Sequence, residues 1–316
     1  MSNKGKLVAL VVVSILLAAA FIFIDLGSNW DYALPRRLKK VYAIILTGAT
    51  IAFATVVFQT ITNNRILTPS IIGLDSLYLL IQTFLIFVFG SMSFAITNEN
   101  INFIVSVILM VIFASFLYKI LFRGNGENIY FLLLVGIIFG TFFRSISEFM
   151  QVLIDPNEFM VVQDRMFASF NNVKTDLLLI STVLVILVAL YSLRLIKYLD
   201  VLSLGKDQAI NLGVDYDYIV KRLLIVIAVL ISISTALVGP ITFLGLLVAN
   251  VAYQFLNTYK HSILIIGSIF ISIIALVGGQ FIVERVFTFD TTLSVIVNFI
   301  GGVYFIYLLL KERKSW

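Results

Sequence analysis

The sequence predicts an all-α integral membrane protein. Of its 316 residues, 61% are hydrophobic and 12% are charged, whereas soluble domains carry about 25% charged residues. The apolar residues gather into stretches of about 20 residues, the length that an α-helix needs to cross the hydrocarbon core of a bilayer. We therefore expect a single transmembrane domain over residues 1–316, without a separate soluble domain.

Apolar stretches of this length predict ten membrane-crossing helices. They fall at residues 6–25, 39–60, 71–90, 101–122, 129–149, 176–196, 220–238, 240–258, 262–283 and 292–310. The first stretch follows Lys4 and Lys6 and has two interpretations, a signal peptide cleaved near Ala18–Ala20 or an uncleaved span. The apolar run continues past the alanines, which favours the uncleaved span.

Three features refine the later elements. Asp75 interrupts the third stretch, and we expect it near a membrane interface, where a charge costs less than at mid-depth. The segment Arg144–Asp176 is the longest loop on its side of the membrane and is expected to include an interfacial helix. The seventh and eighth stretches are separated at Gly239-Pro240, because proline lacks the backbone N–H and ends a helix.

The distribution of lysine and arginine predicts the orientation of the chain. With both termini in the cytoplasm, fourteen of the 22 basic residues lie in cytoplasmic segments, as the positive-inside rule requires. Four basic residues in an outer segment oppose this bias, and their position needs a separate explanation: Arg36, Arg37, Lys39 and Lys40. We expect a multi-pass protein of the plasma or inner membrane, in contact with lipid.

The cytoplasmic segment 197–221 concentrates charge between two uncharged apolar stretches, Leu177–Leu193 and Leu223–Tyr259. Within it, Gly205 and Gly213 flank a run long enough for about two helical turns. Glycine allows the chain to turn sharply at both ends. The segment therefore has two interpretations, an ordinary solvated loop or a short rigid helix over Lys206–Leu212 that meets a partner.

Sequence motifs for catalysis and metal binding are absent. There is no G-x-x-x-x-G-K-[ST] motif for nucleotide and no H-E-x-x-H motif for zinc. The chain has no cysteine, and its one histidine, His261, is expected in a solvated or headgroup-facing position. The net charge of +5 is too small to indicate nucleic-acid binding. We expect no catalytic residue, no metal site and no cofactor in this chain.

Away from the ends of the predicted spans, polar residues are few, and they are amides, serines and threonines. Gln59, Asn64 and Asn250 are candidates for lining a translocation path, although hydrogen bonding between helices explains each of them as well. Gly136 and Gly140 fit close helix packing. With no charged residue expected at mid-depth, the chain lacks the groups that ion-coupled carriers use, so we expect it to be powered by another protein.

Three motifs together resemble a known family. The first is Leu34-Pro35-Arg36 followed by Gln59, Asn64, Leu67, Pro69, Ile72 and Gly73. The second is Leu204-Gly205, Ala209 and Leu212-Gly213-Val214, and the third is Gly239-Pro240-Ile241, Phe243 and Gly245-Leu246. Their order and spacing resemble the membrane permeases of iron–siderophore and cobalamin ATP-binding-cassette importers, across nearly the whole chain.

The resemblance implies the fold of the cobalamin-importer permease, with ten helices per subunit and a pore made by two subunits. It implies that the second motif, Leu204, Gly205, Ala209, Leu212, Gly213 and Val214, couples to two partner ATP-binding subunits, which hold ATP and magnesium. It also implies that Arg36 and Arg285 contact glutamates on an extracytoplasmic siderophore-binding protein. Residues 68–75 are similar to the branch that serves catecholate-type siderophores, in which two different permeases pair.

We therefore expect a permease subunit that translocates a ferric siderophore. The alternatives are an ion-coupled carrier of a small solute and a membrane scaffold without transport activity. For Arg36–Lys40 the alternative to docking is that all four side chains extend to lipid headgroups at the outer end of the second span. The sequence departs from the family where Asn250 follows Val248-Ala249 and where Leu74-Asp75-Ser76 follows Gly73, and the loop near Arg285 is shorter.

Overall fold

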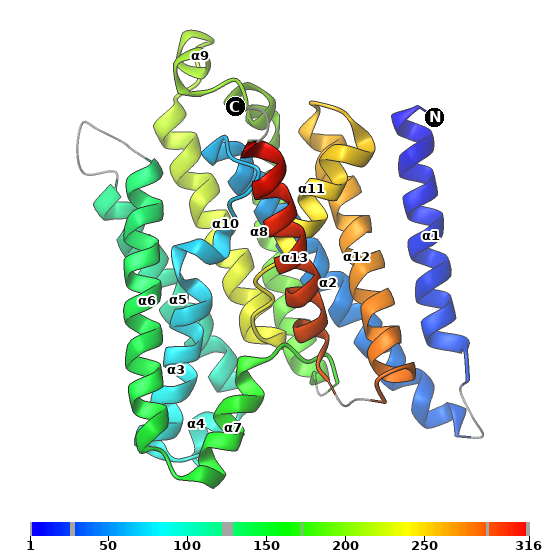
Figure 1. The fold of residues 1–316 in the computed structure, drawn as a ribbon, viewed down its shortest axis with the longest axis vertical. Helices are drawn as coiled ribbons and strands as arrows, with labels where there is room; N and C mark the ends of the chain where they lie inside the picture. Colours follow the sequence, from blue (N-terminus) through cyan, green and yellow to red (C-terminus); the bar gives the residue numbers. More distant parts are fainter. Residues whose placement is uncertain (1, 26–28, 122–128, 172, 289–290, 314–316) are drawn as a thin grey trace.

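The computed structural model describes residues 2–25, 29–121, 129–171, 173–288 and 291–313, and this part of the chain is built from helices with no strand (Figure 1). In chain order the elements are α1 (Asn3–Phe23), α2 (Trp30–Thr62), the 3-10 helix η1 (Pro69–Ile72), α3 (Leu74–Phe89), α4 (Phe94–Thr97), α5 (Glu99–Leu121), α6 (Ile129–Leu153), α7 (Pro156–Met166), α8 (Thr175–Leu202), α9 (Lys206–Asn211), α10 (Tyr216–Val238), α11 (Leu244–Leu256), α12 (His261–Arg285) and α13 (Leu293–Arg313).

Ten of these helices correspond to the ten predicted spans, which confirms the predicted fold class. Seven are long and apolar enough to cross a membrane, namely α1, α2, α5, α6, α8, α10 and α12. The other three, α3, α11 and α13, are shorter apolar helices. In Figure 1 the start of α1, the end of α13 and helix α9 lie at one end of the molecule, while α4 and α7 lie at the other.

Helix α2 forms the centre of the fold. It has 33 residues, and most of its second half is buried against α10, α11 and α12. It begins nine residues before the predicted start because Pro35 lies in its second turn and does not end it. Helix α11 crosses α2 closely: a Cβ atom added to Gly245 would lie 2.1 Å from Thr55 Oγ1. Glycine at this position is therefore required by the approach of the two helices.

Helices α3 and α11 begin inside the protein, and this corrects the predicted spans 71–90 and 240–258. At 1.5 Å per residue their 16 and 13 residues extend about 24 and 20 Å, less than the ~30 Å of the hydrocarbon core. The chain after α2 turns back into the protein, and η1 packs on the middle of α6, where Gly136 and Gly140 leave room for its backbone. These two glycines thus accommodate a 3-10 helix and the turn after it.

The predicted interfacial helix between the fifth and sixth spans is present as α7. Asp155 caps its start, with Oδ1 accepting a hydrogen bond of 2.9 Å from the backbone N–H of Asn157. Pro156 occupies the first helical position, where its missing N–H has no cost. Residues 167–170 then return toward the core, and the backbone N–H of Ser169 donates to the carbonyl of Val238 at 2.8 Å. The outer segment is therefore anchored to the end of α10.

Candidate functional site

The charged segment between α8 and α10 forms a short helix, α9, with a defined structure at each end. Gly205 precedes it with φ +99°. At its end, the N–H of Gly213 donates to the carbonyl of Ile210 at 2.9 Å and the N–H of Val214 to that of Ala209 at 3.0 Å. With Gly213 at φ +80°, this is the Schellman arrangement that closes helices. The short helix predicted between two glycines is present.

Helix α9 is fixed on one side and exposed on the other. Ala209 is fully buried, and Lys206 forms an ion pair with Asp217 at 3.4 Å. In the same segment three large apolar side chains are exposed: Leu204 by 56%, Ile210 by 48% and Leu212 by 62%. Figure 1 shows α9 projecting from one end of the helical bundle. A rigid element that exposes apolar side chains to water is suited to contact another protein.

The end of α8, which leads into α9, is bonded to the start of α12. One carboxylate oxygen of Asp200 accepts hydrogen bonds from the backbone N–H of His261 at 2.8 Å and from its ring Nδ1 at 2.7 Å. The expected solvated position of His261 is wrong, since only 4% of the residue is exposed. A carboxylate is favoured there because the first turn of α12 presents unpaired N–H groups.

Two of the three candidate lining amides meet at a single backbone carbonyl. Gln59 Nε2 and Asn250 Nδ2 donate to the carbonyl oxygen of Arg65 at 2.7 and 2.8 Å. The third, Asn64, accepts a hydrogen bond from the N–H of Ile66 at 2.9 Å. All three thus hold the chain where it turns back after α2. Gln59 also borders a cavity of about 280 Å³, together with Arg65 and with Ser203 at the end of α8.

Asp75 lies deep in the protein, and its expected position near an interface is wrong. It follows Gly73 by two residues, and Gly73 packs against Gly140, the twelfth residue of the 25-residue α6. The two oxygens of its carboxylate lie 3.4 Å from Thr235 Oγ1 and 3.5 Å from Thr242 Oγ1. The hydroxyl residues around the adjoining small cavity are Thr55, Thr68, Ser70, Ser234, Thr235 and Thr242.

This carboxylate joins the two places where the helical path is broken. Asp75 is in the first turn of α3, and Thr242 comes just before α11, so two helix starts lie close to its carboxyl group. The partial positive charge of a helix N-terminus stabilises a carboxylate, and the threonine hydroxyls add polar contacts. The signal in the sequence was the pairing of two breaks, Pro69–Gly73 and Gly239-Pro240, each followed or preceded by hydroxyl residues.

The basic residues at the outer end of α2 separate into two groups. Arg37 turns inward and donates to four carbonyls at the end of α1, among them Ile24 O at 2.7 Å and Asp25 O at 3.0 Å. Lys40 forms an ion pair with Glu284. Arg36 is exposed, and its guanidinium stacks on the ring of Tyr32 at 4.7 Å. Arg36 is thus exposed at the surface, whereas Arg37 and Lys40 are engaged within the chain.

Arg285, the other candidate docking residue, is engaged within the chain. Its guanidinium forms an ion pair with Asp25 and donates to the carbonyl of Ile24 at 2.9 Å. One third of its side chain remains exposed. Arg285 and Arg37 together fix the end of α1 against α2 and α12. The two candidate arginines therefore differ, because only Arg36 has its charge unpaired by a carboxylate in the described residues.

Comparison with known proteins places these features in a family. Residues 5–311 match the family model described as the FecCD transport family. The chain is 66% identical over 316 residues to "Petrobactin import system permease protein YclO" of Bacillus subtilis strain 168, covering all of both chains. It is 24% identical to YclN of the same strain, also named as a petrobactin import system permease protein, over 88% of this chain and 85% of that one.

A solved structure supports the fold. An inward-facing structure of a putative metal-chelate type ABC transporter superposes with a TM-score of 0.85 at 20% sequence identity, covering 98% of this chain and 100% of the other. At this identity the match concerns the fold alone.

Proposed function

Because this chain belongs to the FecCD transport family, we propose that it is the permease subunit of an ABC importer that carries a ferric siderophore across the cytoplasmic membrane. Petrobactin, or a siderophore of similar chemistry, is the proposed cargo, because a relative with 66% identity over its full length is named for petrobactin import. The chain is a membrane transport subunit, and ATP hydrolysis is assigned to a separate ATPase.

The observation that carries this proposal is the structure of α9. The helix lies between two bilayer-length helices, α8 and α10, and is closed by Gly205 and Gly213. The exposed side chains of Leu204 and Leu212 flank it. An ATPase that binds these side chains would move the ends of α8 and α10 together. A flexible loop would not transmit the same movement to these helices. Two ATPase subunits, each binding ATP and magnesium, are the proposed cytoplasmic partners.

Two further partners complete the proposed assembly. A second, non-identical permease would form the other half of the pore, and the existence of two different Bacillus subtilis permeases named for petrobactin import supports this. A siderophore-binding protein would dock at the outer end, where Arg36 is exposed. Gln59, Asn64 and Asn250 are proposed to shape the path near its cytoplasmic end, where they hold the turn after α2.

Reconstitution in proteoliposomes tests the proposal. The chain is combined with its partner permease, the ATPase and the binding protein, and uptake of ⁵⁵Fe-labelled siderophore is followed. Uptake should require ATP and should stop when the ATPase carries a substitution that blocks hydrolysis. Equal uptake with the inactive ATPase would reject the proposal.

An ion-coupled carrier is the second candidate, because Asp75 places a carboxylate inside the protein after all. In that case this chain alone should take up solute when a sodium or proton gradient is applied, and Asp75→Asn should abolish the uptake. ATP-dependent uptake that is unaffected by collapsing both gradients would exclude it. Failure of both kinds of uptake in a correctly folded assembly would favour the scaffold interpretation.

A further inference from the structure

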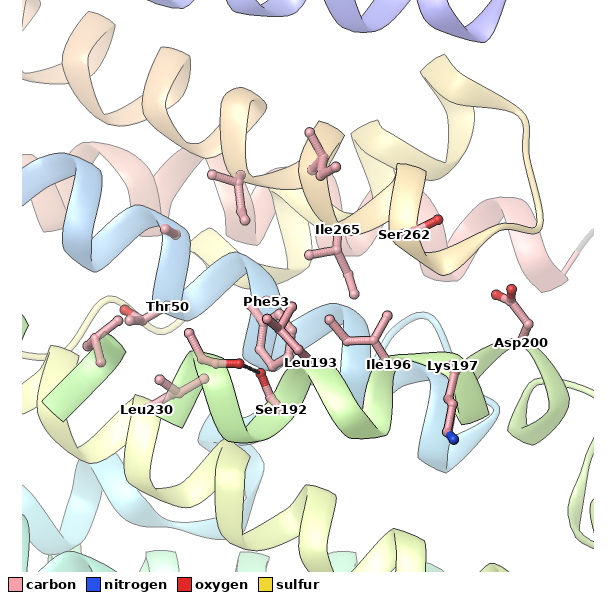
Figure 2. A pocket seen from close by; sticks show the side chains of 15 residues that line it. Thr50, Phe53, Ser192, Leu193, Ile196, Lys197, Asp200, Leu230, Ser262 and Ile265 are labelled. Carbon is pink, nitrogen blue, oxygen red and sulfur yellow. Dashed lines mark hydrogen bonds between the residues drawn. The ribbon is translucent and has the colours of Figure 1, made fainter. Parts of the chain in front are cut away.

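An apolar groove runs along one side of the protein between α2, α8 and α12. Figure 2 shows the side chains that line it, and its volume is about 620 Å³. Its lining comes from α2, α8, α12 and one residue of α10, and it includes Phe53, Ala189, Leu193, Ile266 and Ile269. Helix α2 forms its floor, and α8 and α12 form its sides. These two side helices contact each other less than each of them contacts α2.

The floor of the groove offers no free hydrogen-bonding group. Thr50 Oγ1 donates to the carbonyls of Leu46 and Thr47, at 3.0 and 2.8 Å, and Ser192 Oγ donates to the carbonyl of Ala189 at 2.8 Å (Figure 2). Both hydroxyls are therefore satisfied within their own helices. Buried cavities that hold water need several polar partners, so this groove suits a hydrocarbon.

The groove is open at the side, toward the bilayer. Leu193 and Ile266 on its rim are exposed by 61% and 46%, whereas Thr50 on its floor and Ser192 and Ile265 on its inner sides are buried. In a membrane such a space is filled by lipid or by another protein. The length of the groove and the cation at its end favour a lipid.

The groove spans one leaflet and is narrow. From Lys197 to Val185, α8 rises about 18 Å, slightly more than half of the ~30 Å hydrocarbon core. Spread over that length, 620 Å³ corresponds to a channel about 7 Å wide. A single acyl chain fits this space.

The cytoplasmic mouth of the groove carries an available cation. Lys197 is exposed, lies 4.9 Å from the ring of Tyr198, and forms no ion pair among the described residues. The neighbouring Asp200 is engaged by His261 through one carboxylate oxygen. A lysine at this level is placed to meet a lipid phosphate.

We propose that this groove binds one acyl chain of a phospholipid of the cytoplasmic leaflet, with the lipid phosphate held at Lys197. The bound chain would fill the space between α8 and α12 beside α2. It would thereby support the cytoplasmic half of α8, which leads into α9.

Photo-crosslinking in membranes tests this with the full assembly. Phosphatidylethanolamine with a diazirine near the end of one acyl chain is compared with diacylglycerol carrying the same chain. The labelled positions are identified by mass spectrometry. Labelling at the buried floor, Thr50 and Phe53, should be several-fold higher with the phospholipid. Labelling at Leu187, exposed on α8 outside the groove, should be the same for both lipids.

Two matched pairs of variants sharpen the test. Lys197→Gln should lower labelling of the floor by the phospholipid roughly fivefold, while Arg194→Gln, an exposed cation on the same helix outside the groove lining, should leave it unchanged. Ala189→Phe should fill the groove and reduce labelling with both lipids, and Leu190→Phe on the same helix should not.

Three results would overturn the proposal. Equal labelling of the floor by phospholipid and diacylglycerol would remove the role of Lys197. No labelling of the floor, with normal labelling of Leu187, would show that no lipid enters. Labelling of the isolated chain that disappears when the partner permease is present would identify a protein segment as the occupant.

Discussion

The two ends of the molecule present different chemistry to their surroundings. At the end that we propose to be cytoplasmic, α9 is a closed helix flanked by the exposed side chains of Leu204 and Leu212. At the outer end, the surface near α2 carries charges, of which Arg36 is exposed and Lys40 is paired with Glu284. Apolar contacts on a rigid element can transmit displacement, whereas exposed charges act mainly on the rate and orientation of encounter.

This difference predicts unequal consequences of mutation. Removing an apolar contact at α9 should reduce binding strongly and independently of salt, because buried apolar anchors dominate interfaces. Reversing a charge at the outer end should have a smaller effect that weakens as salt rises. The predictions below test this contrast, beginning with the largest expected effect.

Leu212→Asp should have the largest effect. Placing a charge where an apolar side chain meets the ATPase should weaken ATPase binding about 30-fold, as expected for an interface hot spot of about 2 kcal/mol. The matched control is Asn211→Asp, which adds the same charge at the neighbouring exposed position. Affinity is measured by titrating ATPase onto the permease in nanodiscs at low and high salt. Equal losses for both variants would mean that charge, and not apolar contact, matters at this end.

Gly213→Val should uncouple hydrolysis from transport while leaving membrane insertion intact. A Cβ atom at Gly213 would meet nothing within 4 Å, so the cost comes only from its φ of +80°. That cost is about 1–2 kcal/mol, enough to open the end of α9 in a large fraction of molecules. ATP hydrolysed per siderophore imported should rise about tenfold. Gly213→Asn is the control, because asparagine adopts this conformation more readily, and normal coupling in Gly213→Val would contradict the role of a rigid α9.

Arg36→Glu should weaken docking of the binding protein roughly fivefold at low salt, with the difference vanishing at high salt. Surface plasmon resonance at several salt concentrations measures this, and reversal of the facing glutamate to arginine should restore binding. Arg285→Glu should have a second effect. It should also loosen the end of α1, because Arg285 is paired with Asp25. If neither variant changes docking at low salt, these residues serve only the outer ends of their helices.

Breaking the ion pair between Lys206 and Asp217 should have the smallest effect. Both side chains are more than one third exposed, and exposed pairs contribute about 0.5 kcal/mol. A double-mutant cycle of Lys206→Ala and Asp217→Ala, followed by thermal unfolding in detergent, should give a coupling energy of that size. A coupling above about 2 kcal/mol would show that this pair, rather than the glycines, fixes α9.

The contrast also explains what the sequence could predict. Helix α9 depends on neighbouring residues, since Gly205 and Gly213 set its ends, and sequence reasoning placed it within one residue. The ten apolar segments could also be predicted, because each is a continuous run of apolar side chains. Helix α7 could be expected because the loop that contains it is the longest on its side of the membrane.

Features made by distant residues could not be predicted in this way. Asp75 meets Thr235, near the end of α10, and Thr242, just before α11. These residues are more than 150 positions from Asp75, so no local pattern encodes their meeting. His261 was expected in solvent because its partner, Asp200, is 61 residues away. The separation of Arg36 from Arg37 depends on which of them points toward the end of α1.

The most direct test of the two-ended arrangement uses cysteine labelling, for which the chain is suited because it contains no cysteine. Leu212→Cys and Arg36→Cys are treated with a membrane-impermeant maleimide in intact cells and after permeabilisation. Arg36→Cys should react in intact cells, and Leu212→Cys should react only after permeabilisation and should be protected by bound ATPase. Reaction of Leu212→Cys in intact cells, or no protection by the ATPase, would contradict the assignment of α9 as the cytoplasmic coupling element.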